Sequence, residues 1–108
     1  MALDLPQPLS EYFAAANTDD ADRIAACFAE DAKVHDENQD IVGRPAIRLW
    51  AAETRRKTNF RSEPFALEGE PDAPVVRAQV SGNFPGSPVD LTYRFNMANG
   101  AIAALSIG

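Results

Sequence analysis

The sequence has very little of the chemistry that metal centres and disulfides need. Its 108 residues include one cysteine and one histidine. An internal disulfide, a structural zinc site and a multi-histidine metal centre are therefore excluded, and carboxylates alone remain as a metal option. The chain also lacks a GxSxG motif, a glycine-rich phosphate loop and a P-loop lysine, which removes the usual parts of serine hydrolases and nucleotide-binding enzymes. We expect neither a metal nor a cofactor.

Long apolar segments are also missing. Uninterrupted apolar runs such as residues 101–105 fall far short of the roughly 20 residues of a membrane span, and no signal-peptide pattern begins the chain. The composition, 45% hydrophobic and 24% charged, is that of a globular chain whose length suits one domain over residues 1–108. We expect a cytoplasmic protein without a membrane partner.

Charge is unevenly distributed along this acidic chain, whose net charge is -6. Residues 1–40 carry ten acidic and two basic side chains, whereas residues 41–61 carry six basic and one acidic. The overall acidity argues against a nucleic-acid partner. The basic segment 44–61 is interpreted as a solvated helix face that pairs with the acidic N-terminal third, and binding of an anionic partner is the alternative.

Apolar spacing predicts two helices near the N-terminus. The first ends near Asn17 and has its apolar stripe at Leu9, Tyr12, Phe13 and Ala16. The second runs to about Asp31, after a capping-like spacing of Asp19 and Asp22, and has its stripe at Ala21, Ile24, Ala25 and Phe28. Both stripes follow the i, i+3, i+4, i+7 pattern of amphipathic helices.

The rest of the chain predicts a short strand, a third helix and four further strands. Residues 33–36 form the short strand and residues 37–42 a polar loop, after which Gly43 and Pro45 begin the helix. From Asn59 onward, proline and glycine punctuate four alternating strands. The predicted order is helix, helix, strand, helix and four strands. This order indicates an α+β fold with three helices on a curved, mainly antiparallel sheet.

Asp36 and Tyr12 are the candidate chemical groups. Asp36 follows Val34 on the inward face of the short strand, where partial burial raises a carboxyl pKa toward the range of a general base; a solvated turn residue is the alternative. Tyr12 lies on an apolar helix stripe, so its phenol bonds either to backbone or to a ligand. His35 points to the opposite face from Asp36, and Cys27 is interpreted as a packing residue.

Two stretches of the chain resemble a known family. Residues 12–36, YFAAANTDDADRIAACFAEDAKVHD, and residues 43–50, GRPAIRLW, are similar to the nuclear transport factor 2-like superfamily, in its SnoaL-like and ketosteroid-isomerase-like branch. The Arg94-Phe95-Asn96 strand that leads through Asn99-Gly100 into the last strand also fits. The resemblance covers most of the chain. It implies a cone-shaped α+β barrel with an apolar pocket, assembled as a homodimer through the sheet.

The resemblance also implies roles for individual residues. The isomerase's catalytic tyrosine corresponds to Tyr12 and its general-base aspartate to Asp36. Its second oxyanion donor, a protonated aspartic acid, corresponds to Leu91, so this chain lacks that donor. Removal of one such donor costs about 2.7–4 kcal/mol of transition-state stabilisation. We expect the pocket to be lined by Phe28, Trp50, Leu91, Tyr93 and Phe95.

Three functions remain open at this stage. The first is an isomerase or cyclase that binds a small apolar molecule and removes a proton next to its carbonyl. A second enzyme class, a dehydratase or epoxide hydrolase, would use Asp36 to activate water. The non-enzymatic alternative is a hydrophobic-ligand carrier or a dimerising interaction module. For the homodimer, Val75 and Ile102 are expected on the sheet face away from the helices.

Overall fold

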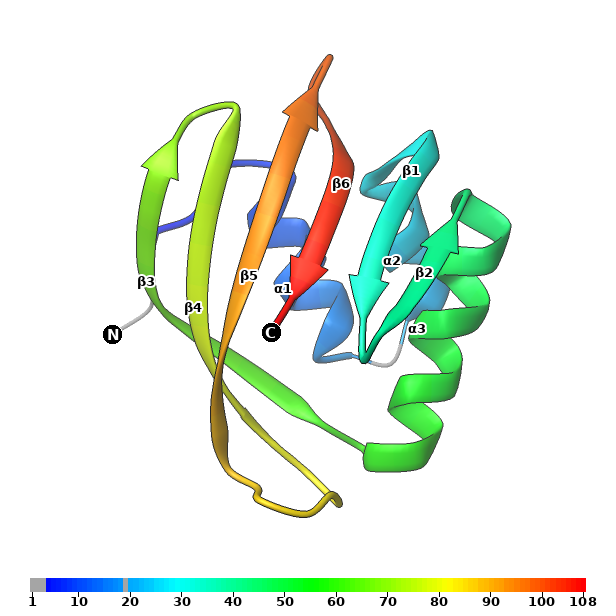
Figure 1. Ribbon diagram of the computed structural model, residues 1–108, viewed down its shortest axis with the longest axis vertical. Coiled ribbons are helices and arrows are strands. Elements are labelled where there is room, and N and C mark those ends of the chain that lie inside the picture. Colours follow the sequence, from blue (N-terminus) through cyan, green and yellow to red (C-terminus); the bar gives the residue numbers. More distant parts are fainter. Residues whose placement is uncertain (1–3, 19) are drawn as a thin grey trace.

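The protein folds as three helices on one face of a six-stranded sheet (Figure 1). The computed structural model describes residues 4–18 and 20–108. The helices are α1 (Leu9–Ala16), α2 (Ala21–Ala26) and α3 (Arg44–Thr58), and the strands are β1 (Phe28–Asp36), β2 (Gln39–Val42), β3 (Arg61–Glu70), β4 (Ala73–Ser81), β5 (Val89–Ala98) and β6 (Ala101–Ile107). The strand order is β2-β1-β6-β5-β4-β3. Strands β1 and β6 are parallel, and the other neighbours are antiparallel.

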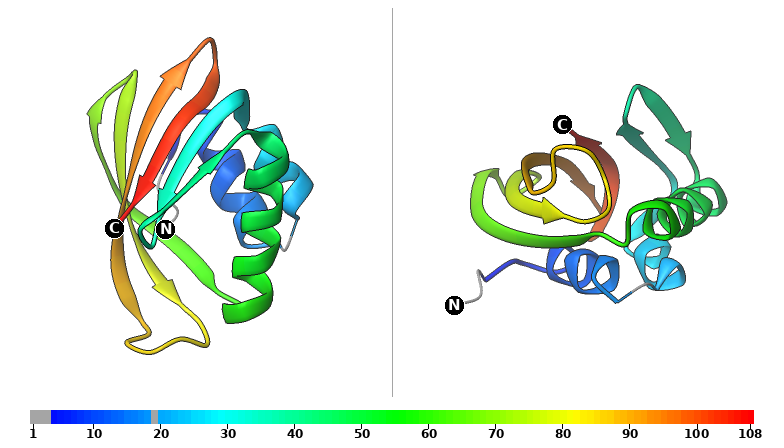
Figure 2. Two further views of the ribbon diagram at one scale, coloured as in Figure 1. Left: turned by 45° about the vertical axis from the view of Figure 1, so that its right-hand side comes forward. Right: turned by 90° about the horizontal axis from the view of Figure 1, so that it is seen from below.

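The curved sheet wraps partly around the helices, which confirms the predicted α+β architecture. Figure 2 shows all three helices on one side of the sheet. The sheet does not close into a barrel, because β2 and β3 remain as free edges. Alternation along the strands places the core on the helix side: in β4, Val76, Ala78 and Val80 are buried, whereas Arg77 and Gln79 are exposed.

Helix α2 is shorter than predicted, and the strand after it is longer. The helix ends at Ala26 and β1 begins at Phe28, although the apolar spacing extends the helix through Phe28 toward Asp31. Pairing with β6 decides the outcome, because Phe28 lies opposite Ile102 and the Cys27 carbonyl accepts a hydrogen bond from the Ile102 amide at 3.0 Å. A tertiary contact thus overrides local spacing.

The predicted loop at residues 37–42 contains strand β2. Strands β1 and β2 form a hairpin, with Asp36 opposite Gln39 and a tight turn at Glu37 and Asn38. Both turn residues have positive φ values, 51° and 64°, as a type I′ turn requires. The strand was missed because Ile41 alone in β2 is buried, so the segment shows no run of alternating apolar residues.

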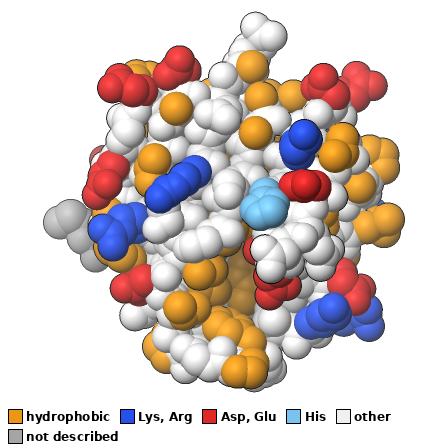
Figure 3. All heavy atoms as spheres, viewed as in Figure 1, with side chains coloured by type: hydrophobic (Ala, Val, Ile, Leu, Met, Phe, Trp, Pro, Cys, Tyr) orange, Lys and Arg blue, Asp and Glu red, His pale blue; other side chains and the backbone are white. Residues whose placement is uncertain are grey.

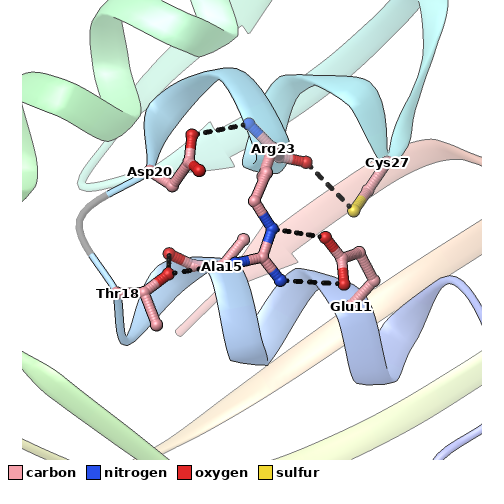
Figure 4. Close-up of polar contacts among 6 residues, drawn as sticks. All are labelled: Glu11, Ala15, Thr18, Asp20, Arg23 and Cys27. Atoms are coloured by element: carbon pink, nitrogen blue, oxygen red, sulfur yellow. Dashed lines mark hydrogen bonds and ion pairs between the residues drawn. The ribbon is translucent and has the colours of Figure 1, made fainter.

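The first two helices are joined by a cluster of polar contacts (Figure 4). Arg23 donates from Nε and Nη2 to the two carboxylate oxygens of Glu11, at 2.7 and 3.0 Å. Asp20 caps α2 by accepting from the Arg23 amide at 3.2 Å; the predicted cap residue Asp19 lies outside the described residues. Cys27 donates to the Arg23 carbonyl at 3.4 Å. The Arg23–Glu11 pair joins α2 to α1, and the contacts of Asp20 and Cys27 lie at the two ends of α2.

The basic side chains of α3 are paired in several ways. Arg48 forms an ion pair with Asp22 at 2.5 Å, a contact with the acidic N-terminal region that the charge distribution predicts. Arg55 donates to the Ala16 carbonyl at the end of α1, and its guanidinium lies 4.5 Å from the centre of the Phe60 ring.

Within the described residues, no helix is both long enough and apolar enough to cross a bilayer.

The face of the sheet away from the helices differs from the prediction in one residue. Ile102 is fully buried in the core rather than on this outer face. The reason is a break in alternation: the pairing register shifts between Asn96 and Met97, and the buried residues of β6 are Ile102 and Leu105. Val75 is half-buried and lines a shallow hollow of the sheet with Lys33 and Arg94.

Candidate functional site

Asp36 stands at the end of β1, where the chain turns toward β2. It shares a strand face with Val34, which is fully buried, and is itself half-buried. Trp50, on α3, donates its indole N–H to Oδ2 of Asp36 at 3.0 Å. The indole therefore occupies one carboxylate oxygen and fixes the orientation of the group. Among residues 4–18 and 20–108, no donor is bonded to the other oxygen, Oδ1.

The surroundings of Asp36 favour a carboxyl group that holds its proton more tightly than usual. Burial raises the pKa of Asp36, and the hydrogen bond from Trp50 opposes this by stabilising the charged form. The nearby Glu37 carboxylate raises this pKa further, and His35 lowers it. Since the net shift is upward from the ordinary value of 3.8, Asp36 is a stronger base than a solvated aspartate.

Tyr12 is held within a cluster of aromatic rings. It comes from α1, is 4% exposed, and packs edge-to-face on Phe28 and Phe95, with ring centroids 5.9 and 5.8 Å away. Within residues 4–18 and 20–108, its hydroxyl has no hydrogen-bond partner, which disfavours the alternative of a core tyrosine bonded to backbone. Burial, followed by the nearby Tyr93 and Asp36, raises the pKa of Tyr12 well above its usual value. The phenol is therefore protonated at neutral pH.

A cavity of about 420 Å³ brings these groups together. Its volume is in the usual range for small-molecule sites. The lining residues come from all three helices, from strands β1 and β3 to β6, and from the segments between them: Tyr12, Phe13, Ala16, Ile24, Asp36, Glu37, Trp50, Ala51, Thr54, Thr58, Phe60, Ser62, Val80, Phe84, Pro85, Leu91, Tyr93 and Ile107. Figure 3 shows a hollow in the surface with a hydrophobic floor and acidic side chains at its rim. The walls are thus largely apolar with a few polar groups.

Two of the residues expected in the pocket are elsewhere. Phe28 and Phe95 are 0% and 2% exposed, belong to the core, and are not part of the cavity lining. Phe28 is drawn into the core by the pairing of β1 with β6. Both rings instead support Tyr12 from the side. The other expected residues, Tyr12, Asp36, Trp50, Leu91 and Tyr93, line the cavity.

His35 is outside this site. Its ring is exposed and its Nδ1 lies 2.9 Å from Oδ1 of Asp40, its cross-strand neighbour on β2. This is the orientation that strand alternation predicts. Of the described residues, no group of three or more His, Cys, Asp or Glu side chains is arranged to hold a metal.

Sequence reasoning missed the polar groups that α3 and β3 supply. Ser62 is 1% exposed, and its Oγ lies 3.2 Å from the Tyr93 hydroxyl. Thr54 and Thr58 line the same cavity, and the Thr58 hydroxyl is committed to the Thr54 carbonyl at 2.8 Å. Ser62 lies between two charged residues in the sequence, and only strand alternation within β3 would have suggested that it points inward.

Comparison with known proteins gives a consistent family and fold. The SnoaL-like domain family matches residues 9–105. A crystal structure from Sinorhizobium meliloti, of a protein proposed to be a polyketide cyclase, is 41% identical and superposes with a TM-score of 0.93, covering 97% of this chain and 96% of that one. No functionally curated protein matches the sequence.

More distant structures share the fold alone. A protein with a ketosteroid isomerase-like fold from Catenulispora acidiphila, crystallised with trimethylamine, is 18% identical with a TM-score of 0.86 over 97% of this chain and 86% of that one. A nuclear transport factor 2-like protein from Cytophaga hutchinsonii is 13% identical with a TM-score of 0.79 over 100% and 93%. With the match over residues 9–105, these similarities show that the chain belongs to the SnoaL-like domain family and has the nuclear transport factor 2-like fold.

Proposed function

We propose that this protein binds a small, largely apolar carbonyl compound in the cavity and catalyses removal of a proton next to the carbonyl. Asp36 is the general base and Tyr12 donates a hydrogen bond to the carbonyl oxygen. Isomerisation of an unsaturated ketone or cyclisation of a polyketide-like ketone is the overall reaction. The description of the Sinorhizobium relative as a proposed polyketide cyclase supports this class of substrate.

Asp36 accepts and later returns the proton, and the electron pairs move only within the substrate. The Asp36 carboxylate takes a proton from the carbon next to the carbonyl. The C–H electron pair becomes part of a C=C bond, and the carbonyl π pair moves to oxygen. Tyr12 stabilises that enolate oxygen without giving up its proton, because its pKa is raised by burial. Asp36 then returns the proton to another carbon, or to the alkoxide that forms when the enolate carbon attacks a second carbonyl.

One observation carries the proposal: a carboxyl group of raised pKa lines the same apolar cavity as a phenol that has no hydrogen-bond partner among the described residues. Partial burial makes Asp36 more basic than a solvated carboxylate. The Tyr12 hydroxyl has a hydrogen to donate, and a ligand oxygen in the cavity would accept it. Both features suit enolate chemistry, and neither is needed merely to fold the domain.

The test is proton exchange at carbon. A β,γ-unsaturated ketone is incubated with the protein in D₂O, and loss of the proton next to the carbonyl is followed by ¹H NMR. Asp36→Asn is expected to lower the exchange rate by about 10² to 10⁴. The matched control His35→Ala removes the neighbouring side chain on the opposite face and is expected to leave the rate unchanged. Equal rates in native protein and Asp36→Asn would refute the base assignment. Saturable ligand binding without exchange would indicate a carrier.

We further propose that two copies associate through the outer face of the sheet. The half-buried Val75 and the shallow hollow around it lie on that face, and burial of this surface is the expected driving force. Light scattering should give a mass of twice 11.7 kDa, and Val75→Glu should reduce it to one copy. Leu49→Glu is the control, because Leu49 is 65% exposed on α3, on the helical side of the molecule. A single-copy mass for the native protein would contradict this proposal.

A further inference from the structure

Two buried hydroxyl groups lie side by side in the wall of the cavity. Ser62 on β3 and Tyr93 on β5 are 1% and 4% exposed, both line the cavity, and their oxygens are 3.2 Å apart. Strands β3 and β5 flank β4 in the sheet, so the two side chains reach each other across it. Neither residue is needed by the reaction as described for Asp36 and Tyr12.

Ser62 is held firmly in this position. Its amide donates to Oδ1 of Asn17 at 2.7 Å, and its carbonyl accepts from Nδ2 of Asn17 at 2.7 Å. Asn17 is the C-terminal cap residue of α1. This double contact ties β3 to the helix that carries Tyr12. The Ser62 backbone is therefore fixed relative to α1, and its hydroxyl contacts that of Tyr93.

The hydroxyl pair retains one unused donor. Each hydroxyl has one hydrogen to donate, and the pair shares one hydrogen bond, in which either oxygen can be the donor. In the described part of the chain, neither hydroxyl has another side-chain or backbone acceptor. When Ser62 donates to Tyr93, the phenolic hydrogen of Tyr93 remains free. Such a buried donor is costly without an acceptor, and a ligand oxygen would satisfy it.

The second phenol lies close to the first and is also packed among aromatic rings. The rings of Tyr12 and Tyr93 meet at an angle of 65° with centroids 6.3 Å apart, and Phe13 packs on Tyr93 at 5.0 Å. Burial raises the pKa of Tyr93 to about 12, so this phenol, like Tyr12, keeps its proton at neutral pH. The cavity thus offers two fixed phenolic donors. A carbonyl or enolate oxygen has lone pairs for both.

We propose that Tyr93, supported by a hydrogen bond from Ser62, is the second donor to the substrate oxygen and replaces the acid that the family resemblance expects at Leu91. Leu91 and Tyr93 are two positions apart on β5, so their side chains lie on the same face and both line the cavity. The proposed second donor is therefore two positions further along β5 than the family resemblance expects. This inference rests on the proposed function and extends it to a substrate oxygen held by two phenols.

Binding of 2-naphthol tests the donor pair without requiring turnover. The oxygen of this probe mimics an enolate oxygen, and its fluorescence reports both affinity and the fraction bound as naphtholate. Tyr93→Phe and Tyr12→Phe are each expected to weaken binding about tenfold and to lower the naphtholate fraction, as loss of one hydrogen bond implies. Ser62→Ala leaves the Tyr93 ring in place and is expected to weaken binding about threefold, with a lower naphtholate fraction.

Thr92→Val is the matched control. It removes a hydroxyl from the same strand, next to Tyr93 but on the opposite face and outside the cavity lining, so affinity and the naphtholate fraction should not change. If Tyr93→Phe binds 2-naphthol as the native protein does while Tyr12→Phe binds weakly, Tyr93 is not a donor and the inference is overturned. Failure of the native protein to bind would also overturn it. Failure of the proposed function is separate: binding would persist, but native protein and Asp36→Asn would show equal proton exchange.

Discussion

Replacing Trp50 with phenylalanine tests how the carboxylate of Asp36 is tuned. The indole donates to Oδ2 of Asp36 at 3.0 Å, and this bond favours the charged form. A hydrogen bond to a charged group contributes about 1.5–3 kcal/mol. Since Asp36 is only half-buried, water replaces part of the lost bond, and about 1–1.5 kcal/mol remains. At 1.36 kcal/mol per pKa unit, Trp50→Phe should raise the pKa of Asp36 by about one unit.

The assay is a ¹³C NMR titration of the Asp36 side-chain carboxyl, which requires no substrate. The native midpoint should lie above 3.8, the ordinary value for this group, and the Trp50→Phe midpoint should be higher still. The acid limb of the pH profile for proton exchange should move by the same amount. Thr54→Val is the control, because it alters the same helix and cavity without touching the carboxylate. An unchanged or lower midpoint in folded Trp50→Phe would refute this account of Asp36.

Three further predictions concern stability and reactivity. Because the pKa of Asp36 is raised in the folded state, its contribution to stability is present at low pH and is lost as pH rises through the folded pKa. Asp36→Asn should therefore melt at a higher temperature than native protein at pH 7 and at a similar temperature below pH 3.8; equal melting temperatures at pH 7 would contradict this. Burial raises the pKa of Cys27 to about 11, so its thiol should react with an aromatic disulfide far more slowly in folded than in denaturant-unfolded protein, and rapid labelling of folded protein would argue against burial. Phe28→Ala should lower the free energy of unfolding by about 3–5 kcal/mol in urea titrations, whereas Phe65→Ala, at a side chain that is 50% exposed, should change it by less than about 0.5 kcal/mol.

The sequence predicts the layers of this fold well because each layer has a strong apolar period. Tyr12 and Phe13 define one helix, and Val76, Ala78 and Val80 define a strand, through residues close together in the chain. Boundaries that depend on distant pairing were predicted poorly. Phe28 fits a helical stripe, but its partner is Ile102 on β6. Local spacing contains no information about that contact.

In the candidate site too, local features could be predicted from the sequence, whereas contacts between distant elements could not. Strand alternation is enough to place Asp36 and His35 on opposite faces, and the structure has them so. The bond from Trp50 to Asp36 and the contact between Ser62 and Tyr93 join different elements. Such contacts depend on how α3 and β3 are positioned by the rest of the fold. The local spacing of apolar residues in a single sequence does not predict how these elements are placed relative to each other.

The parallel pairing of β1 with β6 has a consequence for how the protein is made. The pairs Val34 with Leu105 and His35 with Ser106 join the strand that carries Asp36 to β6, which lies far along the sequence. Closing a loop of this length costs about 4 kcal/mol of chain entropy, so this contact is expected to form late in folding. During synthesis, β1 already has β2 beside it, but it can pair with β6 only after residue 106 has left the ribosome. The nascent chain therefore lacks the completed sheet around Asp36 until β6 has been made.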